Sequence, residues 1–527
     1  MAPTDQYPHL VIANVEPWGH ARPICAFAAK VVLIRDVQIT MFTSPAVYGR
    51  VVKEIGRAFG PKDANRLKLI RIVALDNTVE GVNDLAEKIK ASTGRYIAEF
   101  VNTYQQLLDE QPITCCVTKT EFAAAASPAM LVVDFMIGSL VSIVRSLPKN
   151  KAKILGFCSG MVAFVYLSFA PTERGGRAAL KDKIIQEAEK SGRPLFDVAD
   201  DTFHTFTEDI IQMPGFPKMH HWEVDPQNTS MMTKGFLGPF WMSLFDTIEQ
   251  TEGLIITSSE VYEPAAVSAT REWLAETVRS VWAIGPLLPS IDSEEAVKGE
   301  EAQSQDASAI TKFVDEVLVK YGERSMLYIS FGSAFWPLDF DKFETFVDVV
   351  IEREIPFIMS HGSPLAQLSD TFKTKVQESG LGLLSPWVPQ QTILDHKALG
   401  WFVSHCGQNS ALEAVSSGNP LICWPFSADQ APNAVHLVVN HDVAYELLEV
   451  RTGNGLKTIY RTGKAPAGTT DAIRAEAHDV LAKAFGEDGA RKRANVKKLQ
   501  ERIHAALSKG GSADVDMGRF LDTLTIP

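Results

Sequence analysis

The sequence predicts an α/β protein made of two doubly wound domains of similar size. Short apolar runs, of the length expected for buried parallel strands, alternate with helical stretches in both halves of the chain. Residues 288–309 separate the two series, because they are acidic and almost free of large apolar side chains, as is typical of a flexible linker. The 527 residues also exceed what one domain of about 150 residues holds.

The first half contains six strand-like segments. They lie at residues 9–15, 37–43, 67–74, 130–135, 154–158 and 254–258. Helical patterns between them are clearest at 23–34 and 82–108. The apolar segment 122–144 is long enough to cross a bilayer, but Pro128 interrupts it and Asp134 lies near its centre, where a charge costs about 2.5–3.5 kcal/mol. We therefore expect a strand followed by a helix there, and no transmembrane segment.

The second half repeats the alternation. Its strand-like segments lie at 326–331, 356–360, 383–388, 400–404 and 420–424, and helical patterns follow at 470–507. The expected units are an N-terminal domain at 1–287, the linker at 288–309, a C-terminal domain at 310–507 and a final segment at 508–527. Paired α/β domains usually bind ligands in the cleft at the carboxyl ends of their strands.

Composition and missing motifs exclude several classes of protein. With 51 basic and 64 acidic residues the net charge is −13, which argues against nucleic acid or an anionic membrane as the main partner. The six cysteines have no metal-site or CxxC spacing, and no signal peptide is evident, so we expect a cytoplasmic protein with reduced thiols. Neither GxGxxG nor GxSxG is present, which argues against a dehydrogenase and a serine hydrolase.

The segment after the strand-like run 400–404 has the pattern of a phosphate site. The run ends in a tight turn of small residues, and a helix follows. Free amide groups and the helix dipole at such a turn favour an anion. Asn409 and Ser410 are hydrogen-bonding residues at the helix start, and His405 adds a donor beside them. Glu413, one turn further along the helix, suits a ribose diol.

Two further residues fit general-base chemistry. His20 follows the first strand, and a histidine with an ordinary pKa of about 6.5 can take a proton from an acceptor hydroxyl. Asp134 ends an apolar strand, where a charge needs a partner, and a carboxylate beside His20 would orient the ring. The structural alternatives are a turn histidine and a helix cap, respectively. Trp387 is a candidate for stacking on a base, and Asp429 and Gln430 are candidates for binding sugar hydroxyls.

The window 387–430 resembles the plant secondary-product signature of the UDP-dependent glycosyltransferases. The matching positions are Trp387, Pro389, Gln390, His396, Gly400, His405, Cys406, Gly407, Asn409, Ser410, Glu413, Gly418, Pro420, Trp424, Pro425, Asp429 and Gln430. Segments 17–23, 284–287, 328–333, 510–512 and 518–521 also resemble parts of this family. The likeness therefore reaches both ends of the chain.

The resemblance implies two Rossmann-like domains facing across a cleft, which is the GT-B architecture. The N-terminal domain would bind the acceptor, with residues 172–251 shaping its pocket, and the C-terminal domain would bind the UDP-sugar. A helix within 508–527 would pack back on the N-terminal domain. The implied catalytic residues are His20 and Asp134. The implied UDP-binding residues are Ser333, Trp387, Val388, Gln390, His405, Gly407, Asn409, Ser410 and Glu413, and the implied donor-sugar residues are Gln408, Asp429 and Gln430.

The implied reaction is inverting transfer of a sugar from a UDP-sugar donor to a hydroxyl of a small lipophilic acceptor, without a cofactor or a metal. The two Asp-x-Asp sequences, at 339–341 and 514–516, follow no buried strand and are not expected to bind metal. Gln430 is typical of glucosyl transfer, whereas Gln408 replaces the tryptophan usual in the plant pattern. Alternatives are another sugar-nucleotide enzyme of this fold, such as an epimerase, and a non-catalytic UDP-sugar binding protein. The sequence does not indicate the acceptor or the oligomeric state.

Overall fold

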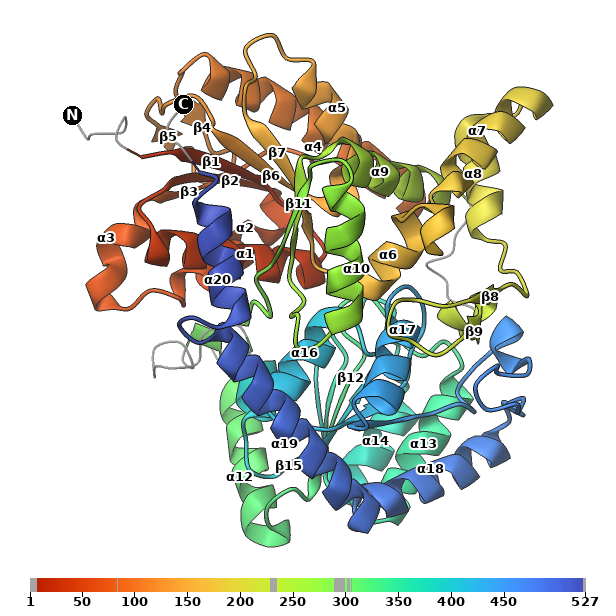
Figure 1. Ribbon diagram of the computed structural model, residues 1–527. Coiled ribbons are helices and arrows are strands. Elements are labelled where there is room, and N and C mark those ends of the chain that lie inside the picture. Colours follow the sequence, from red (N-terminus) through yellow and green to blue (C-terminus); the bar gives the residue numbers. More distant parts are fainter. Residues whose placement is uncertain are drawn as a thin grey trace.

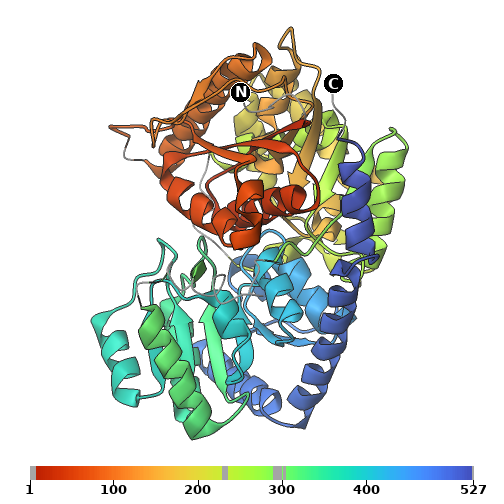
Figure 2. The ribbon, with the colours of Figure 1, turned by 90° about the vertical axis from the view of Figure 1, so that its left-hand side faces the viewer.

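Two parallel β-sheets, each covered by helices on both faces, form the two halves of the molecule (Figure 1). The computed structural model describes residues 7–82, 84–227, 235–288, 299–300, 304 and 306–524. Figure 2 shows the N-terminal half, in red to light green, above the C-terminal half, in green to blue, with the blue last helix reaching up to the N-terminal half. The predicted pair of doubly wound α/β domains is confirmed.

The N-terminal sheet has seven strands in the order β11-β10-β7-β6-β1-β2-β3. Its strands are β1 (His9–Ala13), β2 (Gln38–Thr43), β3 (Ile70–Ala74), β6 (Met130–Asp134), β7 (Lys153–Cys158), β10 (Gly253–Ile256) and β11 (Ser280–Ala283). All neighbours pair in parallel, and β6 lies directly beside β1. Six of these strands were predicted. The edge strand β11 was missed because it has only three buried residues, which merge with the exit from the domain.

Helices cover both faces of this sheet. They are α1 (Trp18–Ile34), α2 (Pro45–Gly56), α3 (Ala64–Leu67), α4 (Leu85–Leu108), α5 (Ser139–Arg145), α6 (Val162–Phe169), α7 (Ala179–Ser191), α8 (Leu195–Phe203), α9 (Leu237–Gln250) and α10 (Pro264–Ala275). Two small hairpins, β4 (Ile113–Thr114) with β5 (Glu121–Phe122) and β8 (Ile210–Ile211) with β9 (Met219–His220), are antiparallel. The apolar segment expected to split into a strand and a helix forms β6 and α5.

The C-terminal sheet has six strands in the doubly wound order β14-β13-β12-β15-β16-β17. Its strands are β12 (Met326–Ser330), β13 (Phe357–Ser360), β14 (Gly382–Ser385), β15 (Leu399–Ser404), β16 (Leu421–Cys423) and β17 (Ala444–Glu446). Its helices are α12 (Ala307–Tyr321), α13 (Phe340–Glu352), α14 (Asp370–Ser379), α15 (Gln390–Leu394), α16 (Gln408–Ser416), α17 (Gln430–Val435), α18 (Thr470–Ala484) and α19 (Glu487–Leu507). Strand β17 was missed because it has three residues and only one of them is fully buried.

The last helix, α20 (Ser512–Leu521), lies against the N-terminal domain, whereas α19 before it packs on the C-terminal domain (Figures 1 and 2). The Phe520 ring lies 5.4 Å from that of Phe27 and 5.8 Å from that of Trp282. Met517 and Leu521 are buried in the same N-terminal core. Burying each such side chain contributes about 1.5–3 kcal/mol, so the end of the chain helps to hold the two domains together.

Two local expectations were wrong. Helix α1 begins at Trp18 rather than at Pro23, so Pro23 lies inside the helix and His20 is in its first turn rather than in a loop. Proline favours the first turn of a helix, which is why the sequence pattern predicts the start of this one at Pro23.

The second of these expectations concerns the linker. Its residues 289–298, 301–303 and 305 lie outside the described residues, but Glu300 and Ser304 are buried rather than solvated. In the described part of the chain no helix is long and apolar enough to span a membrane.

Candidate active site

A cavity of about 490 Å³ lies between the two domains. Side chains that follow β1 and β7 line one wall, and side chains that follow β12, β15 and β16 line the other. All the residues predicted from the sequence to form the site line this cavity except Asp134, which is fully buried behind His20. The carboxyl ends of the two sheets therefore bring these residues together.

His20 and Asp134 are hydrogen-bonded. His20 Nδ1 lies 3.0 Å from Asp134 Oδ2 and 3.2 Å from Oδ1. The pair forms because β1 and β6 are neighbours, with His20 in the first turn after β1 and Asp134 at the end of β6. Asp134 Oδ1 also accepts a hydrogen bond of 2.9 Å from the Met136 amide. Asp134 therefore caps the short helix that follows it, as the structural alternative proposed, and contacts His20 at the same time.

The surroundings of His20 favour a proton acceptor at Nε2. Burial alone would lower the pKa of His20, but the charge and hydrogen bond of Asp134, together with the charge of Asp429, outweigh this effect and raise the pKa above 6.5. Because Nδ1–H donates to Asp134, the lone pair is assigned to Nε2. The Ser159 hydroxyl lies 3.1 Å from Nδ1, and the Phe135 ring stacks on the imidazole at 5.5 Å. The ring is therefore held in one orientation, as a general base requires.

The proline at position 23 leaves a backbone carbonyl in the first turn of α1 free to bond to the other domain. A proline cannot donate the hydrogen bond to the carbonyl four residues earlier, which leaves the Gly19 carbonyl without its helical partner. The Asn409 side-chain amide, from the first turn of α16, donates to this carbonyl instead. Asn409, predicted to bind UDP, thus also fixes the turn that carries His20.

The turns after β12 and β15 bring the residues predicted to bind an anion to one side of the cavity. His405 is packed between Gly332 and Gly407, where an added Cβ would lie 2.8 Å and 2.7 Å from the imidazole ring. Gly332 also has a φ of +75°, a conformation that favours glycine. Burial lowers the pKa of His405 to about 4, so the ring is neutral and acts through its N–H. Ser333 and Ser410 line the cavity beside it, next to the N-terminus of α16.

The residues predicted for the base and the ribose lie further along the same wall. Val388 is buried, and Trp387 is half-buried with the guanidinium of Arg50 4.3 Å from the centre of its ring. Glu413 accepts hydrogen bonds from Gln390 and Arg22, at 2.5 Å and 2.9 Å. Gln390 thus supports Glu413, and a contact between Arg22 and Glu413 was not expected.

Two of the three predicted donor-sugar residues, Asp429 and Gln408, also contact the N-terminal domain. Asp429 accepts a hydrogen bond of 3.0 Å from the Met161 amide at the start of α6, and burial raises its pKa to about 6. Gln430 accepts bonds from the backbone amides that precede it in the same turn. Gln408 Nε2 donates to the Ser258 hydroxyl at 3.1 Å and to the buried Glu263 carboxylate at 3.2 Å. Its Oε1 is buried, with no partner in the part of the chain that the structure describes.

Sequence reasoning missed three contributors, Arg22, Ser159 and Glu263. The only feature of the sequence that could have indicated a role for Arg22 is its position two residues after His20. Burial raises the pKa of Glu263 to about 7, although the residue looks like a surface glutamate in the sequence. The far part of the cavity is aromatic, and its lining includes Phe135, Phe164, Phe203, Phe206, Phe236, Phe240, Trp241 and Phe245. Most of these rings come from within 172–251, the segment predicted to shape the acceptor pocket.

Neither Asp-x-Asp sequence lies at the cavity. Asp339 caps α13 by accepting a bond from the Lys342 amide. Asp516 in α20 is buried and accepts bonds from the Ala283 amide and from Arg271. Within the described residues no group of three or more His, Cys, Asp or Glu side chains is placed to hold a metal ion.

Known proteins resemble this chain over most of its length. A profile of the family described as "UDP-glucoronosyl and UDP-glucosyl transferase" matches residues 227–458. UDP-glycosyltransferase eriJ of Hericium erinaceus is 28% identical, with 98% of each chain covered. The resemblance to the UDP-dependent glycosyltransferases is confirmed. UDP-glycosyltransferase 73C5 of Arabidopsis thaliana is 25% identical over 98% of this chain and 96% of its own. The prediction that this chain is an enzyme, a UDP-glycosyltransferase, is confirmed with it.

Solved structures share the fold. The Medicago truncatula UGT71G1 complexed with UDP-glucose superimposes with a TM-score of 0.67 at 20% identity, covering 99% of this chain and 100% of that one. The Phytolacca americana UGT2 complexed with UDP-2fluoro-glucose and pterostilbene has a TM-score of 0.64 at 18% identity, with 98% and 99% covered. The predicted GT-B architecture is therefore confirmed.

Proposed function

We propose that this enzyme transfers glucose from UDP-glucose to a hydroxyl group of a lipophilic acceptor, with inversion at the anomeric carbon and without a metal ion. The observation that carries the proposal is the His20–Asp134 pair, which lies across the cavity from the turn that precedes α16. A base and a diphosphate site on opposite walls of one cavity are what direct displacement needs.

In the proposed reaction, His20 Nε2 removes the proton from the acceptor hydroxyl. The acceptor oxygen then forms a bond to the anomeric carbon while the bond from that carbon to the UDP oxygen breaks. Asp134 stabilises the imidazolium that results, because the carboxylate already accepts from Nδ1–H. The departing diphosphate carries negative charge towards Ser333, the neutral His405 and the amides at the start of α16. Fixed donors of this kind lower the barrier by stabilising developing charge.

The glucose proposal rests on Gln430 and on the relatives, among which the Medicago protein is a complex with UDP-glucose. The acceptor proposal rests on the aromatic part of the cavity. Rings such as Phe240 and Trp241 bury apolar surface and offer few hydrogen bonds, so they favour a flat lipophilic molecule. A non-catalytic binding protein would have no need for the buried carboxylate behind His20, and an epimerase no need for this acceptor-sized aromatic space.

A transfer assay tests the proposed function. The purified protein is incubated with UDP-glucose, UDP-galactose or UDP-glucuronate, a panel of phenolic, terpenoid and hydroxy-lipid acceptors, and EDTA. We expect UDP release together with a product heavier by one hexose, and the fastest turnover with UDP-glucose. Faster turnover of another donor would contradict the glucose assignment. Loss of activity in EDTA that added Mg²⁺ or Mn²⁺ restores would contradict the metal-independent reaction.

Replacing Gln408 with leucine is expected to raise the KM for UDP-glucose about ten-fold. The change removes the unpartnered Oε1 of a side chain that lines the cavity, and it takes one donor from the Glu263 carboxylate. Steady-state kinetics with varied donor measure the effect, and the exposed Gln111→Leu serves as the control. An unchanged KM for the donor would remove Gln408 from the sugar site.

A further inference from the structure

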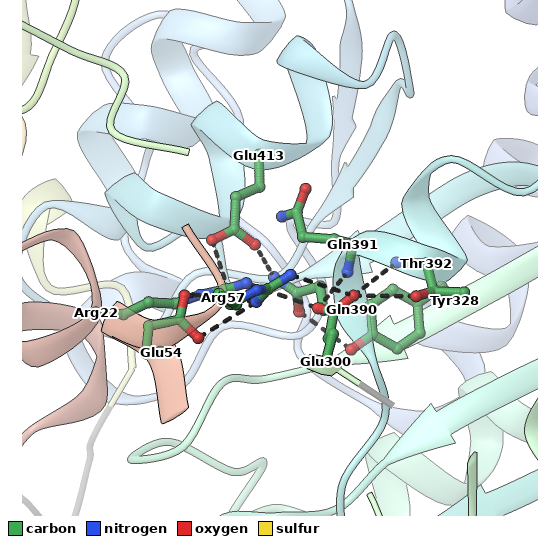
Figure 3. Close-up of polar contacts among 9 residues, drawn as sticks. All are labelled: Arg22, Glu54, Arg57, Glu300, Tyr328, Gln390, Gln391, Thr392 and Glu413. Atoms are coloured by element: carbon green, nitrogen blue, oxygen red, sulfur yellow. Dashed lines mark hydrogen bonds and ion pairs between the residues drawn. The ribbon is translucent and has the colours of Figure 1, made fainter. Parts of the chain in front are cut away.

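A buried cluster of charged side chains joins the two domains beside the nucleotide site (Figure 3). Arg22, Glu54 and Arg57 come from the N-terminal domain, Glu413 comes from α16, and Glu300 comes from the segment between the domains. The Arg22 side chain is 14% exposed, and the three carboxylates are at most 6% exposed. Charges this deeply buried are poorly screened by salt, so their positions depend strongly on one another.

Arg22 directs a different nitrogen at each carboxylate. Nη1 donates to Glu413 Oε1 at 2.9 Å, Nε donates to Glu54 Oε1 at 3.3 Å, and Nη2 lies 3.6 Å from Glu300 Oε1. Burial alone would lower the pKa of Arg22, but the three carboxylates outweigh burial and raise it, so the charge is kept. A lysine has a single nitrogen and cannot reproduce this geometry.

The opposite oxygen of Glu413 is also held. Gln390 Nε2 donates to Glu413 Oε2 at 2.5 Å, and Gln390 Oε1 accepts from the Tyr328 hydroxyl at 3.1 Å. Each oxygen of the Glu413 carboxylate thus accepts one hydrogen bond from a protein side chain, and a carboxylate can accept about four in all. Each oxygen of Glu413 therefore keeps the capacity to accept one more hydrogen bond, which suits a pair of adjacent hydroxyls.

The same helix carries Arg22 and the general base. His20 lies between Gly19, whose carbonyl accepts from Asn409, and Arg22, which donates to Glu413. Asn409 and Glu413 are one turn apart on α16. The N-terminal ends of α1 and α16 are therefore bonded to each other by residues that flank His20 in the sequence.

We propose that Arg22 is a positioning residue for the donor. It holds the Glu413 carboxylate in the orientation that accepts both ribose hydroxyls, and it fixes the ribose relative to His20. This role rests on the proposed function, because it requires a uridine nucleotide at α16. This role differs from merely joining the two domains. The exposed pair of Lys457 and Glu208, 2.6 Å apart, also joins the domains but lies away from the cavity lining, so it serves as a control for domain contact alone.

Nucleotide discrimination tests this proposal. Calorimetric titration measures the Kd of UDP and of 2′-deoxyuridine 5′-diphosphate, which lacks one ribose hydroxyl, for the wild-type protein, R22Q and the control K457Q. We expect the wild type and K457Q to prefer UDP about ten-fold, since an unpaired buried acceptor is costly. In R22Q the preference should fall close to one, and the KM for the donor should rise more than kcat falls.

Two further variants keep the test decisive. The double variant R22Q/E413Q should discriminate no less than E413Q alone, because Arg22 acts through Glu413. If R22Q does not fold, R22K is titrated instead, and we expect a reduced preference because one nitrogen replaces three. A wild-type preference retained in R22Q or in R22K would overturn the proposal.

The wild-type titration separates the proposal from the function. A wild-type protein that binds both nucleotides equally would leave the nucleotide site standing and overturn the role of Arg22. A wild-type protein that binds neither nucleotide would overturn the proposed function and the role of Arg22 with it.

Discussion

Replacing His20 with alanine is expected to lower kcat by about three orders of magnitude while the Kd for UDP stays nearly unchanged. The variant loses the imidazole that its contact with Asp134 and its position in the cavity place to take the acceptor proton. Positioned general bases contribute about 10²–10⁴-fold. The groups placed around the diphosphate, on the opposite wall, remain intact. Turnover with UDP-glucose and calorimetry with UDP measure the two quantities.

The control for this variant is His478→Ala. His478 is 43% exposed and pairs with Glu352 on the surface of the C-terminal domain, so its loss should change neither quantity. Transfer by His20→Ala at the wild-type rate would remove His20 from its role. A large loss of UDP affinity would show instead that the variant had disturbed the contact of Gly19 with Asn409.

Replacing Asp134 with asparagine is expected to lower kcat/KM at least 100-fold near neutral pH. Asparagine has the same shape, but it removes the charge that stabilises the imidazolium of His20. The substitution should also change the pH dependence of kcat/KM. In the wild type the base is active only above the pKa of His20, which lies above 6.5, so kcat/KM should fall as the pH drops through that value.

Without this carboxylate His20 loses the strongest influence that raises its pKa, so burial, which lowers the pKa, is opposed by the charge of Asp429 alone. The acid limb of the pH profile of Asp134→Asn should therefore shift to lower pH. Rates measured between pH 5 and 9 with a saturating acceptor give both profiles. Asp370→Asn is the control, since that side chain is fully exposed at the start of α14. An unshifted acid limb would contradict the coupling of the two residues.

Local pattern was enough to predict most of the site. His20 and Asp134 follow apolar strands, and parallel strands bring their carboxyl ends together, so the contact between residues 114 positions apart follows from the fold class. The turn from β15 to α16 was predicted in the same way, from an apolar run, small residues and a helix start. Such features depend on a few neighbouring residues, which is why sequence alone indicates them.

The contacts between the domains were not predictable in this way. Arg22 and Glu263 are charged residues that a sequence pattern assigns to solvent, but both are covered in the fold and each contacts a residue of the other domain, Glu413 and Gln408 respectively. The start of α1 was misplaced for a related reason. The carbonyl that Pro23 leaves without a helical partner is satisfied by Asn409, which lies 390 positions away in the sequence. Short edge strands such as β17 also lack a pattern of their own, because their neighbours in the sheet determine them.

The configuration of the product at the anomeric carbon tests the account most directly. UDP-α-glucose and the best acceptor are converted by the wild-type enzyme, and the coupling constant of the anomeric proton is read by NMR before secondary reactions occur. Direct displacement by an acceptor that His20 activates predicts a β-glucoside. An α-glucoside would require a different mechanism and would contradict the role assigned to the His20–Asp134 pair.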